Sequence, residues 1–162
     1  MNIIIVYASY YGSTEKCAYK IKEKLKANSI IVNIAYNDFK NLNDYSTIII
    51  GTPLHIGKIH KSIKKFLERF KDDLAKKNLH FFCCALEKDA LEKSLKQIPE
   101  ELISNIKVKE CFGGRIVKSE LSPFERVGIE MIEKKEKLDL TNYNTIDETK
   151  IDNFVKEVEK YI

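Results

Sequence analysis

The chain has 162 residues, a length that suits one domain and leaves little room for two. Its 28 lysine and arginine residues nearly balance 24 aspartate and glutamate residues, giving a formal net charge of +4. The lysines are spread along the chain, which excludes the concentrated basic stripe of a nucleic-acid-binding protein. No apolar run reaches the ~20 residues that a membrane-spanning helix needs. We therefore expect one globular domain over residues 1–162.

The first predicted element begins at the second residue. Residues 3–7 read Ile-Ile-Ile-Val-Tyr, without the basic region and cleavage site of a signal peptide. Such a run predicts a strand over residues 2–8 that is buried on both faces. We expect a cytoplasmic protein, with membrane association at most peripheral, at the inner face.

Helical and strand periodicities alternate along the rest of the chain. Further strands are predicted at residues 30–35, 47–50, 79–85 and 106–112. Helices are predicted at residues 14–27, 62–74, 91–103 with an interruption near Pro99, and 147–161 with a cap at Thr145 or Asp147. An extra segment, residues 115–144, separates the fifth strand from the last helix and contains a short amphipathic stretch.

Five apolar strands that alternate with helices predict parallel pairing and right-handed crossovers. The fold class is therefore α/β, with a doubly wound five-stranded parallel sheet between two helical layers. Such a sheet binds its ligand outside the carboxyl ends of the strands. The loops after strands one, three and four are the expected site.

The loop after the first strand is rich in neutral hydrogen-bond donors and contains no lysine or arginine. Its residues are Ser9, Tyr10, Tyr11, Gly12, Ser13 and Thr14. Backbone N–H groups at a helix start favour an anion, and the loop is neither a Walker A motif nor Gly-x-Gly-x-x-Gly. Two interpretations remain open: a phosphate-binding loop, or an ordinary turn in which Ser13 or Thr14 caps the helix.

The run over residues 5–21 resembles the flavodoxin signature throughout. The matching residues are Ile5, Val6, Tyr7, Ser9, Gly12, Thr14, Ala18 and Ile21. The resemblance implies a flavodoxin-like sheet of order 2-1-3-4-5, in three layers α/β/α. It also implies FMN as the cofactor, with its phosphate in the loop described above.

Two further loops would flank the flavin ring in a flavodoxin-like protein. The predicted loop of residues 51–58 supplies Thr52, Pro53, Leu54, His55, Ile56 and Gly57, and the next supplies Ala85, Leu86 and Glu87. Glycine at position 57 permits a turn close to the ring, because it tolerates positive φ. A Pro/Gly turn without a ligand is the alternative. The 85–90 loop has no aromatic residue, so one face of the ring stays open or an aromatic arrives from elsewhere.

Longer stretches resemble the menaquinone-dependent protoporphyrinogen oxidases, FMN proteins of haem biosynthesis. They are residues 49–51, 56–58, 66–67, 113–116, 123–126, 131–132 and 143–158. The resemblance implies an FMN-dependent oxidoreductase with a small-molecule substrate or quinone acceptor, whose extra segment shapes the substrate side. Arg115 is either a contact for that substrate or a sheet-end arginine. The alternative functions are a flavodoxin-type electron carrier with a redox-protein partner, and a non-catalytic module.

No protein side chain is assigned a catalytic role, and the flavin would perform the chemistry. The four cysteines show neither Cys-x-x-Cys nor zinc-site spacing, so we expect buried thiols and no metal ligands. They are Cys17, Cys83, Cys84 and Cys111. The oligomeric state is left open.

Overall fold

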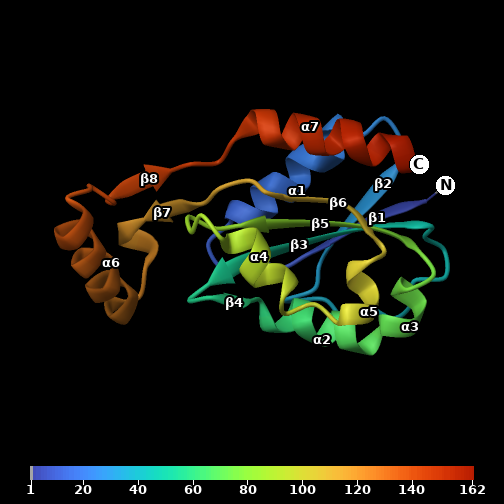
Figure 1. Cartoon of the computed structure of the whole chain (residues 1–162), viewed down its shortest axis with the longest axis horizontal. Helices are drawn as coiled ribbons and strands as arrows, with labels where there is room; N and C mark the ends of the chain where they lie inside the picture. Colours follow the sequence, from blue (N-terminus) through green and yellow to red (C-terminus); the bar gives the residue numbers. More distant parts are fainter. Residues whose placement is uncertain (1) are drawn as a thin grey trace.

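The computed structural model describes residues 2–162 and contains a parallel sheet between two layers of helices (Figure 1). The strands of this sheet are β1 (Ile3–Tyr7), β2 (Ser29–Asn33), β3 (Thr47–His55), β5 (Asn78–Cys84) and β6 (Ile106–Cys111). Their order is β2-β1-β3-β5-β6, and every neighbouring pair is parallel. The predicted flavodoxin-like order and three-layer architecture are therefore confirmed.

Helices cover both faces of the sheet. One face carries α1 (Ser13–Lys24), α7 (Glu148–Val158) and the 3-10 turn η2 (Glu159–Tyr161). The other carries α2 (Lys61–Arg69), α3 (Lys71–Leu74), α4 (Ala90–Leu95) and α5 (Glu100–Ile103). This double covering explains why the strands are almost wholly apolar, because residues on both faces must be buried.

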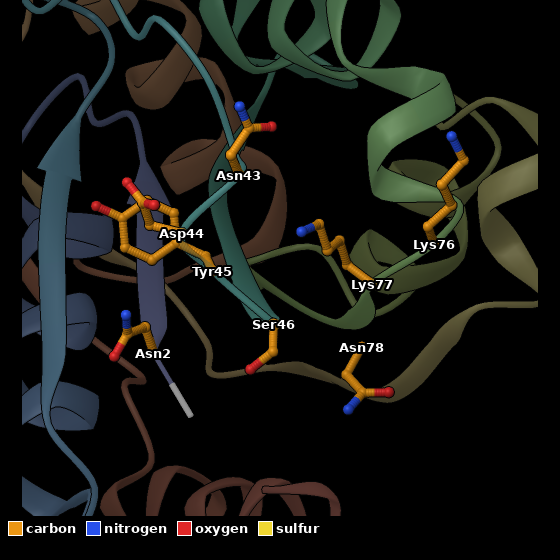
Figure 2. Close-up of a pocket in the computed structure, with 8 residues that line it drawn as sticks. All are labelled: Asn2, Asn43, Asp44, Tyr45, Ser46, Lys76, Lys77 and Asn78. Carbon is orange, nitrogen blue, oxygen red and sulfur yellow. The ribbon is translucent and has the colours of Figure 1, made fainter.

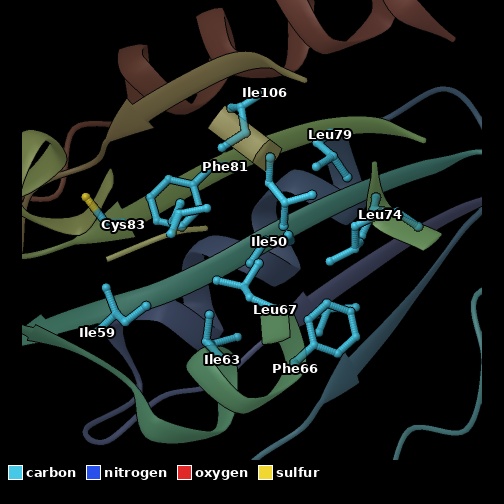
Figure 3. Packing of buried hydrophobic residues seen from close by; sticks show 14 of the residues in the cluster. Ile50, Ile59, Ile63, Phe66, Leu67, Leu74, Leu79, Phe81, Cys83 and Ile106 are labelled. Atoms are coloured by element: carbon cyan, nitrogen blue, oxygen red, sulfur yellow. The ribbon is translucent and has the colours of Figure 1, made fainter. Parts of the chain in front are cut away.

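Alternate residues of each strand enter two separate hydrophobic clusters. In β1, Ile4 and Val6 pack toward α2, whereas Ile3 and Ile5 pack toward α1 and α7. Figure 3 shows the first cluster, in which Phe81 of β5 is fully buried. Burying each such side chain contributes about 1.5–3 kcal/mol to folding. This packing fixes the strand ends from which the site loops project.

The predicted loop over residues 51–58 is wrong in its secondary structure. Strand β3 continues to His55, and β4 (Lys58–Ile59) returns antiparallel to it. Ile56 and Gly57 form the turn with φ of 50° and 68°, as a two-residue hairpin requires. Pro53 is tolerated in β3 because neighbouring β1 has already ended opposite Gly51.

Two predicted helices are each divided in the structure. The helix expected at 62–74 breaks at Phe70 into α2 and α3, and the one expected at 91–103 forms α4 and α5 with Pro99 at the start of α5. Asp147 caps α7, and its carboxylate accepts hydrogen bonds from the N–H groups of Thr149 and Lys150.

The extra segment forms a small unit beyond the carboxyl ends of the strands (Figure 1). It comprises β7 (Arg115–Val117), the 3-10 turn η1 (Lys118–Glu120), α6 (Pro123–Glu136) and β8 (Asn142–Asn144), with β7 antiparallel to β8. Ser122 and Glu125 form a capping box that starts α6. No residue of α6 is buried. Within residues 2–162, no helix is both long and apolar enough to cross a bilayer.

Candidate functional site

A cavity of about 690 Å³ lies between the carboxyl ends of the strands and the extra segment. Most of the predicted site residues line it: Ser9, Tyr10, Tyr11, Ser13, Thr14, Pro53, Leu54, His55, Ile56, Ala85, Leu86 and Glu87. Three loops that are far apart in the sequence therefore meet at one place, as expected for the crevice of a doubly wound sheet.

Three predicted residues do not line the cavity. The Thr52 side chain is buried under β4, where its hydroxyl oxygen accepts a hydrogen bond from the N–H of His60 (3.0 Å). The carbonyl of Gly57 points to the helix side and accepts a hydrogen bond from Gln97 Nε2 (3.0 Å). Gly12 lies between Tyr11 and Ser13, which both line the cavity, and acts through the backbone alone.

Gly12 sets the direction of the loop that begins α1. It is the N-cap residue with φ of 85°, a left-handed conformation that glycine adopts without strain. Its N–H donates to Ser9 Oγ (3.0 Å), and no side chain caps the helix. The alternative that Ser13 or Thr14 is the N-cap is therefore wrong. The first N–H groups of α1 stay free of capping side chains and face the loop.

Thr14 is a buried polar residue whose side chain has no strong partner in the described part of the chain. It is fully buried, and its Oγ1 makes no hydrogen bond to oxygen or nitrogen; it contacts only the weakly polar thiol of Cys84. A buried hydroxyl without a partner costs about 1–3 kcal/mol. With the free N–H groups of α1, this donor fits an anionic group such as a phosphate.

The loop after β1 forms one wall of the cavity, and the β3–β4 hairpin forms the second. Its tip projects outward, with Ile56 exposed beside the cavity. Gln97 anchors the hairpin, because its Oε1 also accepts from the N–H of Ile59 (3.2 Å). The ring of Tyr10 packs against His55 and His60, with centroids 5.3 and 4.4 Å apart. The loop after β1 and the β3–β4 hairpin are thus in direct contact.

The extra segment, which the resemblance implies shapes the substrate side, supplies further residues of the cavity. Those that line it include Arg115, Ile116, Leu121, Phe124, Glu125, Val127, Met131, Ile132 and Tyr143. Phe124 and Tyr143 bring aromatic rings that the 85–90 loop lacks. Arg115 lines the cavity, and its guanidinium lies 3.8 Å from Glu120. The apolar spacing of α6 was visible in the sequence, but nothing local indicated what it faces.

Glu125 joins α6 to both other walls. Its carboxylate accepts hydrogen bonds from the Tyr11 hydroxyl (2.7 and 2.6 Å) and from Ser122, and its Oε1 lies 3.0 Å from His55 Nε2. Burial opposes ionisation, but the hydrogen bonds from Ser122 and Tyr11, with the nearby His55, lower the pKa of Glu125 to about 2. Burial and the Glu125 carboxylate together raise the pKa of Tyr11 to about 12. The cavity therefore contains a fixed negative charge at neutral pH.

A second hollow, of about 610 Å³, lies at the opposite edge of the sheet (Figure 2). It is lined by polar and charged residues, including Asn2, Ser46 and the two lysines Lys76 and Lys77. Its position at the amino ends of the strands differs from the ligand site of doubly wound sheets. The carboxyl-edge cavity is therefore the candidate site.

The fold and the cavity define a doubly wound α/β protein with a ligand site at the carboxyl edge of its sheet. The sequence matches the model of the flavodoxin domain over residues 4–144, and the chain belongs to that family. No curated protein matches the sequence significantly.

Solved structures of flavodoxins share the fold. Oxidised flavodoxin 2 from Bacillus cereus is 19% identical, with a TM-score of 0.65 and complete coverage of both chains. A Fusobacterium nucleatum flavodoxin bound to flavin mononucleotide is 13% identical, with a TM-score of 0.63 over 99% of this chain and 98% of that one. A Lactobacillus acidophilus flavoprotein in complex with FMN is 18% identical, with a TM-score of 0.52 over 70% and 92% of the two chains.

Proposed function

We propose that this protein binds FMN in the carboxyl-edge cavity and works as a flavodoxin-type electron carrier. The observation that carries the proposal is the buried Thr14 hydroxyl without a strong partner, next to the free N–H groups of α1. A terminal phosphate would satisfy these donors together. Two structural neighbours, a flavodoxin and a flavoprotein that are each bound to FMN, support the same cofactor.

The three walls would have separate roles toward the cofactor. Ser13, Thr14 and the start of α1 would hold the phosphate, and the hairpin tip with the 85–87 loop would flank the ring. FMN supplies the ability to accept and release electrons, and the protein orients it and sets its electrostatic surroundings. The Glu125 carboxylate is the fixed charge of that environment.

Family membership and the flavodoxin neighbours support electron transfer more directly than a defined enzymatic reaction. Electron delivery to or from a redox-protein partner is therefore the main proposal. It requires no acid, base or nucleophile from the chain.

One observation favours a second candidate, an FMN-dependent oxidoreductase like the menaquinone-dependent protoporphyrinogen oxidases. The extra segment encloses one side of the cavity with apolar side chains, including Phe124, Val127 and Met131. An apolar wall of this kind suits a flat substrate or a quinone acceptor beside the ring. Arg115 would then meet an acidic or carbonyl group of that molecule.

The decisive experiment is titration of the purified protein with FMN, followed by absorbance. We expect saturable binding with a perturbed flavin spectrum. A spectrum that stays that of free FMN at all protein concentrations would refute the cofactor proposal. For the FMN-loaded protein, fast electron exchange with a redox-protein partner, without turnover of protoporphyrinogen in the presence of menaquinone, would support the electron-carrier proposal. Multiple turnovers would instead establish the oxidase.

A further inference from the structure

All four cysteines of the chain gather in two pairs at the carboxyl end of β5. Cys83 and Cys84 are neighbours in this strand and point to opposite faces of the sheet. Cys83 lies opposite Cys111 of β6, its register partner, and Cys84 lies in the same buried cluster as Cys17 of α1. All four are free thiols. The electron-transfer proposal uses neither pair.

The two pairs differ in access to solvent. Cys17, Cys83 and Cys84 are buried, whereas Cys111 is only half-buried. Of the four, Cys111 is therefore the one most accessible to a reagent from solution, and Cys83 lies opposite it in the β5–β6 ladder. Figure 3 shows Cys83 at the end of the buried cluster around Phe81.

The backbone holds Cys83 and Cys111 opposite each other. They are register partners in the parallel β5–β6 ladder, so their side chains leave the same face. Neighbouring strands lie about 4.8 Å apart, within the Cα separations that disulfides span. The N–H of Phe112 donates to the Cys83 carbonyl (3.0 Å), and the N–H of Ala85 donates to the Gly113 carbonyl (2.9 Å). These bonds fix both strand ends around the pair.

The surroundings of Cys111 favour its thiolate. The neighbouring Cys83 thiol lowers the pKa of Cys111 despite partial burial. The ammonium group of Lys150 acts in the same direction, with its Nζ 3.1 Å from the Cys111 carbonyl. The neighbouring Cys111, together with burial, raises the pKa of Cys83. One reactive thiol and one protonated partner are thus side by side.

We propose that Cys83 and Cys111 form a peroxide-reactive thiol pair that oxidises to a disulfide. A partly exposed thiolate beside a second thiol has the features of an oxidant-sensing site. The Cys17–Cys84 pair lacks the exposed member and stays reduced. The inference does not depend on FMN binding.

The chemistry balances with a hydroperoxide as the oxidant. The Cys111 thiolate attacks the peroxide, the O–O bond breaks, and a sulfenic acid forms as the leaving oxygen takes up a proton to become an alcohol, or water from hydrogen peroxide. The Cys83 sulfur then attacks the sulfenic sulfur. The S–O bond breaks, and the departing hydroxide leaves as water with the Cys83 proton. Two electrons pass from the two thiols to the peroxide.

The disulfide would form at the base of the extra segment and against the cavity wall. Cys111 Sγ lies 3.9 Å from the carbonyl oxygen of Ala85, and Ala85 lines the cavity. Gly114 and Arg115, which follow Cys111 after two residues, line it as well. Oxidation of the pair therefore alters groups next to the ligand site.

The test uses the full-length protein with hydrogen peroxide, free-thiol counting and peptide mass spectrometry. We expect the wild-type protein to lose two free thiols and two hydrogen atoms of mass, with a cross-linked peptide containing Cys83 and Cys111. In Cys83→Ala, a dione reagent should trap the sulfenic acid at Cys111. Cys111→Ser should lose peroxide reactivity.

Cys17→Ala is the matched control, since it removes one thiol of the buried pair and should leave the Cys83–Cys111 product unchanged. Mapping of the disulfide in the wild-type protein by peptide mass spectrometry decides the outcome even if a cysteine variant fails to fold. No thiol loss at peroxide concentrations that oxidise a free peptide thiol would overturn the proposal. A Cys17–Cys84 or intermolecular disulfide as the main product would overturn it equally.

Discussion

Tyr11 and Glu125 are 114 positions apart in the sequence, yet the Tyr11 hydroxyl donates to both carboxylate oxygens of Glu125 at 2.7 and 2.6 Å. This contact joins the loop after β1 to the extra segment. Because α6 buries none of its residues, the polar contacts of Glu125 are a main connection between the helix and the walls of the cavity. The position of α6 over the cavity should therefore depend on them.

Tyr11→Phe should loosen α6 without unfolding the protein. A hydrogen bond of a partly exposed hydroxyl to a carboxylate contributes about 1 kcal/mol, so amide exchange in α6 should accelerate about fivefold. Hydrogen–deuterium exchange measures this directly. Tyr10→Phe is the control, because it keeps the ring contacts with His55 and His60. Equal exchange in the two variants would contradict a role for the Tyr11 hydroxyl.

The same contact predicts a window of pH in which α6 stays docked. The pKa of Glu125 is lowered from 4.5 to about 2. Its contribution to the docking of α6 is therefore complete above pH 4.5 and is lost as the pH falls toward 2. Tyr11 has its pKa raised from 10 to about 12, so its contribution is complete below pH 10 and is lost toward 12. Phe124→Trp would report docking, since the chain has no tryptophan. Its emission should be constant between about pH 5 and 9.5 and should change outside.

Gly12 and Gly57 allow a matched test of the loop after β1. Both have positive φ, 85° and 68°, and a Cβ at either position would meet no atom within 4 Å. Valine at either should therefore cost a similar 1–2 kcal/mol or so of stability through backbone strain. Gly12→Val should lower FMN affinity by at least about tenfold, and more than Gly57→Val does, because it redirects the donors at the start of α1. Equal affinity losses in a titration would mean that Gly12 has no special role.

The sequence was sufficient to predict the sheet, because five apolar runs separated by amphipathic helices have few other arrangements. It did not reveal the β3–β4 hairpin, since Gly51 and Pro53 are typical of a loop, and β4 has only two residues. The three loops of the site followed from strand order. The resemblance indicated that the extra segment shapes the site but not which of its residues do so, because the contact of Glu125 with Tyr11 joins positions that no local pattern relates. Tertiary contacts of this kind require the structure.

Thr14→Val should affect stability and binding in opposite directions. Replacing a buried hydroxyl that lacks a strong partner with a methyl group of the same shape should stabilise the free protein by about 1 kcal/mol. The same change should weaken FMN binding about fivefold, because one phosphate donor is lost. Thr47→Val is the control, since Thr47 is equally buried and unpartnered in the described structure but lies at the amino end of β3. Thermal unfolding with and without FMN separates the two effects. Weakened binding in the Thr47 variant as well would remove the special role of Thr14.

His80 should make the protein sensitive to moderate acid. Its side chain is fully buried on β5 against the ring of Tyr161, and neither ring nitrogen has a hydrogen-bond partner among residues 2–162. Burial, with a smaller effect from Lys107, lowers the pKa of His80 from 6.5 to about 4. The unfolded chain therefore binds the proton more readily, and stability is complete above pH 6.5 and falls as the pH drops toward 4.

The size of this effect follows from the shift. The loss of unfolding free energy due to His80 should reach about 3 kcal/mol near pH 4. It should not grow further below pH 4, where His80 is protonated in both the folded and the unfolded protein. Denaturant unfolding of the wild type and His80→Leu at several pH values isolates it, because the other titrating groups are common to both. The difference in unfolding free energy should widen between pH 6.5 and 4 in favour of the leucine variant. A difference that stays constant across this range would contradict the lowered pKa of His80. Either the imidazole is already protonated in the folded protein, or local opening of the structure exposes it to water.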